Sequence, residues 1–243
     1  MQISVQMYSV REALAEDFQA TVRRLVDIGF EAAEPFRLVE FRDELVRARG
    51  QFDIDFPSAH QSFLSDVDFQ EVLDAASAVG VRYLVDPFWE PTDWEDPARV
   101  ERLAARLNER AEQAADAGVR VGYHNHHFEL AAQHGGRSAL ELFAEHLDPR
   151  VVLEVDTYWA VVGGADITAL LRALGDRVEL VHLKDGDLAP DPAGQQPLGA
   201  GRMPLDETVQ AASSAALGVI EFDEYAGDIF EGLATSLARL SRA

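Results

Sequence analysis

Short apolar segments alternate with amphipathic helical patterns along the whole chain of 243 residues. We expect strands at residues 3–8, 32–35, 55–60, 83–87, 120–124, 151–156, 178–184 and 219–223. Between them, apolar residues recur at spacings of three and four, which is typical of helices that pack one face inward. We place these helices at residues 17–28, 68–79, 97–117, 137–147, 166–174, 205–216 and 228–242. Alternation of strands and helices predicts a parallel sheet.

Eight strand–helix units predict closure into a (β/α)8 TIM barrel, an α/β fold in which residues 1–243 form a single domain. Glycines such as Gly29 and Gly80 follow the helical patterns, as expected at helix C-termini. The alternative is an open doubly wound sheet, which would need a glycine-rich loop after its first strand. The first strand is followed by Tyr8-Ser-Val-Arg11, without glycine, so the barrel is favoured.

Composition restricts the class of protein and its partners. The absence of cysteine excludes disulfides, thiolate zinc sites and a cysteine nucleophile. Only 21 basic residues face 43 acidic ones, a formal net charge of -22, which disfavours nucleic acid because phosphate binding needs Lys and Arg. No apolar run is long enough to span a bilayer, and the first residues do not resemble a secretion signal. We therefore expect a cytoplasmic protein without a membrane partner, with a homodimer as one option.

Metal-binding side chains occur at or just past the ends of four predicted strands. These residues are His124, Asp156, His182 and Glu221. Residues so far apart in sequence meet only if the fold brings strand ends together, as the C-terminal mouth of a parallel barrel does. Histidine and carboxylate ligands suit one divalent ion such as Mn²⁺, Mg²⁺, Co²⁺ or Zn²⁺. The sequence therefore predicts a mononuclear metal site.

Each of these residues also has a purely structural interpretation. Asp156 can cap the following helix, His182 can be a core residue of an apolar strand, and Glu221 can form an internal ion pair. His126 points to the same side as His124, so either can be the ligand while the other moves a proton.

Other residues near the predicted mouth are candidates for contact with a substrate. They are Tyr8, Glu34, His60, Trp159 and Arg202. Residues 185–204 are rich in Gly, Pro and Asp and form an expected mouth loop, which could act as a lid or contact the substrate. Within it, Gly199-Ala-Gly-Arg202 could bind an anionic group through backbone N–H groups.

Six segments, taken in order, resemble the sugar phosphate isomerase/epimerase family of xylose isomerase-like barrels. The segments are Gln6-Met-Tyr-Ser-Val-Arg-Glu12, Gly29-Phe-Glu-Ala-Ala-Glu34, Tyr123-His-Asn-His126 with Phe128-Glu129, Asp156-Thr-Tyr-Trp159, His182-Leu-Lys-Asp185 and Glu221-Phe-Asp-Glu224. The Tyr-His-Asn-His motif is similar to one branch of that family. The resemblance implies a divalent metal held, by position, by His124, Asp156, His182 and Glu221. Many epimerases of the family have Glu where this chain has His124.

We hypothesise a metal-dependent isomerase or epimerase that acts on a sugar, keto sugar or inositol derivative through an enediolate. Glu221, His124 or His126 would remove a proton next to the carbonyl, and Lys184 could donate a proton to oxygen. A lyase or dehydratase acting on a keto sugar or keto-inositol is the alternative, since the same intermediate can lose a β-hydroxyl. An endonuclease IV-like nuclease is disfavoured by the net charge, and a non-catalytic sugar-binding barrel is the third alternative.

Overall fold

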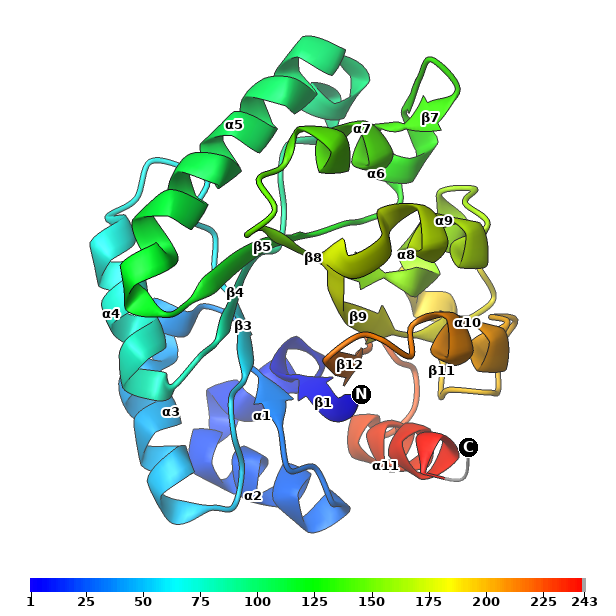
Figure 1. Cartoon of the computed structure of the whole chain (residues 1–243). Helices are drawn as coiled ribbons and strands as arrows, with labels where there is room; N and C mark the ends of the chain where they lie inside the picture. The colour runs from blue at the N-terminus through cyan, green and yellow to red at the C-terminus, as the bar shows by residue number, and fades with distance from the viewer. Residues whose placement is uncertain (242–243) are drawn as a thin grey trace.

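The computed structural model describes residues 1–241, and its centre is a barrel of eight parallel strands (Figure 1). The strands follow the order β2-β1-β12-β9-β8-β5-β4-β3. Two isolated parallel bridges, Ala32 with Asp55 and Phe36 with His60, join the flanks of β2 and β3 and complete the circle. The strands are β1 Gln2–Gln6, β2 Ala33–Glu34, β3 Ser58–His60, β4 Tyr83–Asp86, β5 Arg120–His124, β8 Val152–Asp156, β9 Val178–Leu183 and β12 Leu217–Ile220. The predicted TIM barrel is therefore confirmed.

The helices surround this barrel (Figure 1). They are α1 Arg11–Glu16, α2 Phe18–Ile28, α3 Leu38–Gln51, α4 Phe69–Val79, α5 Pro97–Ala114, α6 Phe128–Ala131, α7 Ala139–His146, α8 Thr157–Val162, α9 Ile167–Leu174, α10 Leu205–Ala211 and α11 Ile229–Leu240. Asp17 and Asp68 cap α2 and α4 by accepting backbone N–H groups of the first turn. Gly29 and Gly80 end the same helices in the left-handed conformation, which glycine adopts without strain.

Some boundaries differ from the sequence-based expectation. The helix α3 was not predicted, because it buries only Leu38, Leu45 and Ala48 and therefore shows little apolar periodicity. The predicted helix at 205–216 ends at Ala211. The helix predicted at 228–242 corresponds to α11, and residue 242 lies outside the described residues.

The barrel interior changes from apolar to polar along the strands. Near its N-terminal end, an apolar cluster fills the interior with Val152, Leu180, Leu217 and Val219, against which Tyr83 packs. Side chains on a strand alternate between its two faces, so the next inward positions on β8 and β9 are Glu154, Asp156 and His182. These positions lie at the C-terminal ends of the strands. The same alternation that builds the apolar floor thus places ionisable groups at the mouth.

Two short antiparallel hairpins lie in the loops outside the barrel sheet. They pair β6 Gln133–His134 with β7 Arg137–Ser138 and β10 Asp185–Gly186 with β11 Gln195–Gln196. Among residues 1–241, no helix combines the length and hydrophobicity needed to span a bilayer.

Candidate metal centre and cavity

Four candidate metal ligands meet at the mouth of the barrel. His124 ends β5, Asp156 ends β8, His182 lies in β9 and Glu221 directly follows β12. One donor atom from each residue lies within 4.8 Å of the donor atoms of the other three. All four side chains are buried, because they point from the strand ends towards the barrel axis. The structure therefore brings together the complete predicted set.

Asp156 has both a structural and a potential metal-binding role. Its Oδ1 accepts the N–H of Trp159 at 2.8 Å and so caps α8. Its backbone N–H and carbonyl are paired with the Asn125 side-chain amide at 3.1 and 3.3 Å, which ties β8 to the end of β5. Its Oδ2 is buried and has no hydrogen-bond donor. The carboxylate is thus fixed in place by one oxygen, while the other accepts no hydrogen bond.

Lys184 places a buried ammonium group against this centre. Its Nζ lies 2.9 Å from Asp156 Oδ2, without hydrogen-bond alignment, 2.7 Å from Glu221 Oε2 and 2.8 Å from Asp223 Oδ2. Burial by itself lowers the pKa of Lys184, but attraction by the three carboxylates outweighs burial and holds the pKa well above its usual range. The ammonium is therefore a permanent charge at neutral pH.

Carboxylates outnumber that ammonium in the buried interior. Five carboxylates converge here, from Glu34, Glu154, Asp156, Glu221 and Asp223. Burial opposes ionisation of Glu221, but Lys184 and His182 lower its pKa well below the usual range. Burial, reinforced by repulsion from His182, lowers the pKa of His124 well below its usual value, so its imidazole is neutral and available as a ligand. Converging carboxyl groups, a neutral imidazole and an oxygen without a hydrogen-bond donor fit a divalent ion.

A second layer of ionisable residues lies directly beneath the first. Here His60, His124, Glu154 and His182 also present donor atoms within 4.8 Å of one another. Glu154 Oε2 lies 2.5 Å from His60 Nε2 and 3.1 Å from His124 Nδ1. Glu34, predicted as a substrate contact, belongs to this buried layer, where its Oε1 accepts from Gln6 at 2.7 Å. The mouth therefore holds two stacked layers of polar groups that share two histidines.

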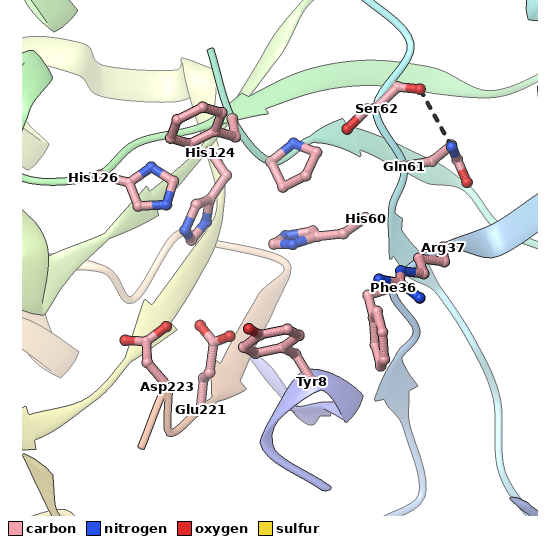
Figure 2. A pocket seen from close by; sticks show the side chains of 12 residues that line it. Tyr8, Phe36, Arg37, His60, Gln61, Ser62, His124, His126, Glu221 and Asp223 are labelled. Atoms are coloured by element: carbon pink, nitrogen blue, oxygen red, sulfur yellow. Dashed lines mark hydrogen bonds between the residues drawn. The ribbon is translucent and has the colours of Figure 1, made fainter. Parts of the chain in front are cut away.

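A cavity of about 340 Å³ opens above these layers (Figure 2). It is lined by Tyr8, Phe36, Arg37, His60, Gln61, Ser62, Pro87, Phe88, His124, His126, Glu221 and Asp223. Its volume falls in the range of small-molecule sites, and its wall combines aromatic rings with convergent polar groups. Two candidate ligands, His124 and Glu221, face this space, so a bound small molecule could reach an ion held there.

His126 lies in the cavity wall rather than in the candidate ligand set. The carboxylate of Glu129 is fully buried and accepts the His126 backbone N–H and the Tyr123 hydroxyl, both at 2.8 Å. The His126 ring stacks on Phe128 and meets the edge of Phe88. Its Nδ1 has no hydrogen-bond partner. The ring is therefore held in place, with the buried Nδ1 lying 3.8 Å from Glu129 Oε1.

Of the other four predicted substrate contacts, the structure places two in the cavity wall and two outside it. Tyr8 and His60 line the cavity, whereas Trp159 and Arg202 do not. The Trp159 indole N–H donates to Asp223 Oδ2 at 3.1 Å, so this residue supports the wall from behind. Arg202 lies at the surface, where its guanidinium donates to the carbonyl of Asp187.

The predicted mouth loop is held by its own contacts. The buried Asp185 carboxylate accepts the backbone N–H groups of Gly186, Gly199, Gly201 and Met203. These donors include the glycines that we considered for anion binding, so they are already occupied. The loop supports the site through Gln195, which exchanges two hydrogen bonds with Asp223.

Several site residues were not predicted from the sequence. Glu154 stands two positions before Asp156 in Leu-Glu-Val-Asp, and strand alternation alone would have placed both on the inward face. Phe36 and Arg37 follow the second strand, and Phe88 follows the fourth. Arg37 has a positive φ of 51°, which is uncommon for a residue with a side chain. Their positions after strand ends were the available signal.

Comparisons with known proteins identify the same architecture. The family model for the xylose isomerase-like TIM barrel matches residues 22–226. A sugar phosphate isomerase/epimerase from Parabacteroides distasonis is similar in structure, with a TM-score of 0.84 and 22% identity over 99% of this chain and 93% of that one. The probable 3-DHS dehydratase AsbF from Bacillus anthracis has a TM-score of 0.78 and 16% identity, covering 99% of both chains. The IOLI protein, with a bound zinc atom, has a TM-score of 0.73 and 15% identity over 100% of this chain and 97% of that one. No curated protein sequence gives a significant match.

Proposed function

Because the chain belongs to the xylose isomerase-like TIM barrel family, we propose that it is a divalent-metal-dependent isomerase or epimerase. Its substrate would be a sugar, keto sugar or inositol derivative. The observation that carries the proposal is the meeting of His124, Asp156, His182 and Glu221 at the floor of an open cavity. The zinc atom in the similarly folded IOLI protein supports the choice of a divalent ion.

The ion would be held by these four residues and would polarise a substrate carbonyl as a Lewis acid. The His126 imidazole lines the cavity and is partly exposed, and we assign to it removal of the proton next to that carbonyl. Glu221 also faces the cavity, but Lys184 and His182 lower its pKa and so weaken it as a base. We therefore assign it chiefly a ligand role. Lys184 lies behind the carboxylates and does not line the cavity, so it stabilises their negative charge rather than donating to substrate.

Proton removal next to a carbonyl gives an enediolate. The carbon atom and the face at which this intermediate is reprotonated determine the product. Reprotonation on the opposite face of the same carbon gives an epimer, and reprotonation on the neighbouring carbon gives an isomer. Aromatic rings of Tyr8, Phe36 and Phe88 provide apolar surface against which the C–H faces of a sugar ring can pack. Arg37 stands at the edge of the same cavity as a hydrogen-bond donor.

Dehydration is the second candidate reaction. The enediolate can instead expel a hydroxyl group from the β-carbon, and protonated His126 could protonate that leaving group. The similar fold of a probable dehydratase is compatible with this outcome. A nuclease is less suitable, since Arg37 is the sole Lys or Arg among the residues that line the cavity.

The test combines metal loading with proton exchange. Metal-loaded protein would be incubated with a panel of keto sugars and keto-inositols in heavy water, and deuterium uptake would be followed by NMR. We expect exchange with at least one substrate and a reduction of about 10²- to 10⁴-fold in His126→Asn. His146→Asn, an exposed histidine at the end of α7, is the control and should exchange at the wild-type rate. Bound metal without exchange from any member of the panel would favour the sugar-binding alternative instead.

A further inference from the structure

Two carboxylates beneath the proposed metal centre contact the same histidines from the barrel interior. Glu154 projects from β8 and Glu34 from β2, and neither is exposed to solvent. Each keeps one oxygen without a hydrogen-bond partner. Neither carboxylate lines the cavity, so neither is placed to touch a substrate. A role for them must act through their neighbours.

The two shared imidazoles stand between the inner and outer carboxylates. His124 Nδ1 lies 3.1 Å from Glu154 Oε2, while its Nε2 lies 3.7 Å from Asp156 Oδ2. His182 Nε2 lies 2.9 Å from Glu34 Oε1, while its Nδ1 lies 2.6 Å from Glu221 Oε2. Each ring therefore directs one nitrogen inward and the other towards the proposed metal centre.

The orientation of the two imidazole rings determines which nitrogen of each ring can bind an ion. A neutral imidazole has one N–H and one lone pair, so a lone pair on the outward nitrogen requires the proton on the inward one. An inward N–H in a buried place needs an acceptor. We propose, resting on the metal centre assigned above, that Glu154 is a positioning residue that fixes the tautomer and orientation of His124. Glu34 acts in the same way on His182.

The surroundings of Glu154 hold it in position for this role. His60 Nε2 lies 2.5 Å from Glu154 Oε2 and 3.1 Å from Glu34 Oε1, so it links the two carboxylates. The pairing of β8 with β9 shifts register between Leu153 and Glu154. Such irregularities re-aim side chains and are common next to active sites. The β8 strand therefore departs from regular pairing at Glu154, the residue that contacts His124.

A second ion in the inner layer is the competing interpretation, since His60, His124, Glu154 and His182 could also hold a metal. That set uses both histidines of the outer set. A neutral imidazole has a single lone pair and cannot ligate two ions at once. Glu221 of the outer set lines the cavity, whereas Glu154 of the inner set does not. With one ion in the outer set and the inner carboxylates as hydrogen-bond acceptors, both ring nitrogens of His124 and of His182 have a partner.

Binding of Co²⁺ to the full-length protein tests this role without relying on activity. The affinity would be measured by competition with a chromophoric chelator, the stoichiometry by elemental analysis, and the ligand geometry from the visible spectrum. In Glu154→Gln we expect one Co²⁺ per chain, a dissociation constant raised about 10- to 100-fold, and a shifted spectrum at full occupancy. Asp156→Asn, which changes a direct ligand, should bind far more weakly than Glu154→Gln.

Glu129→Gln is the matched control, because Glu129 is equally buried but contacts Tyr123 and His126 rather than the candidate ligands. It should bind Co²⁺ with wild-type affinity. Wild-type affinity in Glu154→Gln would overturn the inference. So would two ions per wild-type chain, or loss of the ion in Glu154→Gln with retention in Asp156→Asn, because either result places metal in the inner layer. Normal Co²⁺ binding without deuterium exchange would reject the proposed function and leave this inference standing.

Discussion

Replacement of Lys184 by Met should expose the electrostatic cost of the buried carboxylates. Lys184 is the only lysine in the chain, since all other basic residues are arginine. It is 2% exposed and contacts three carboxylates at 2.7 to 2.9 Å. Methionine fills a similar volume without charge. The substitution therefore removes the neutralising ammonium while leaving Asp156, Glu221 and Asp223 in place.

The expected loss is large in the metal-free protein. Removal of one partner from a buried ion pair typically costs about 3–5 kcal/mol, because the remaining charge is left uncompensated. For a chain of this size, that loss lowers Tm by about 6–20 °C. A divalent ion at the same carboxylates would restore the missing charge, so saturating metal should recover most of the loss. Metal should therefore raise the Tm of Lys184→Met by more than that of wild type.

The pKa of Lys184 determines the pH at which this comparison is valid. Its folded-state pKa is raised, so its contribution to stability is fully present below the unfolded value of about 10.4 and is lost as pH rises through the folded value. Urea unfolding at pH 7 therefore measures the complete effect. Because there is a single lysine, selective ¹⁵N labelling gives one side-chain signal, whose titration reports the folded pKa directly.

Arg172→Met is the control, since it removes one positive charge from an exposed position on α9 and should change stability by no more than about 0.5 kcal/mol. A loss below about 1 kcal/mol in metal-free Lys184→Met would refute the reasoning. An equal Tm increase on adding metal to wild type and variant would also contradict it, because the ion would then not replace the ammonium.

Two further predictions concern the stability of the fold. The Asp86 carboxylate is buried and accepts the N–H groups of Phe63 and Leu64, and burial raises its pKa to about 6. Since this exceeds the unfolded value of about 3.9, the folded state retains the extra proton, and stability should fall by about 3 kcal/mol as pH rises from about 4 to 6. Asp86→Asn should flatten that part of the urea-stability profile, and an unchanged profile would count against the assignment. A Cβ at Gly122 would lie 2.7 Å from Val152 Cγ2 and 2.8 Å from the Val152 carbonyl oxygen, so Gly122→Ala should lose about 1–3 kcal/mol in urea unfolding. Wild-type stability would show that β5 and β8 can separate without cost.

The barrel itself could be predicted because its signals are local and repeated. Each strand is a short apolar run, and most helices show an apolar stripe, an Asp at the start or a Gly at the end. The helix α3 lacks that stripe, since many of its positions are charged and exposed, and it was missed. Closure of the barrel depends on bridges such as Phe36 with His60, which join segments whose strands are too short to be distinctive.

The candidate ligands could be predicted because strand ends converge in any parallel barrel. The division of labour among the histidines could not. His124 and His126 both follow β5 and point to the same side, yet only His124 joins the donor set, while Glu129 and Phe128 hold His126 in the cavity wall. That difference arises from packing against another element, which strand periodicity does not encode.

The sequence by itself determined the architecture and the presence of potential metal ligands at four strand ends, because each depends on residue type and order. The tertiary structure decided which polar groups touch. It placed Glu154 beneath His124, surrounded Lys184 with three carboxylates and left Trp159 and Arg202 outside the cavity. These are contacts between residues far apart in the chain. Their partners are set by strand register and side-chain packing, which exist only once the barrel has closed.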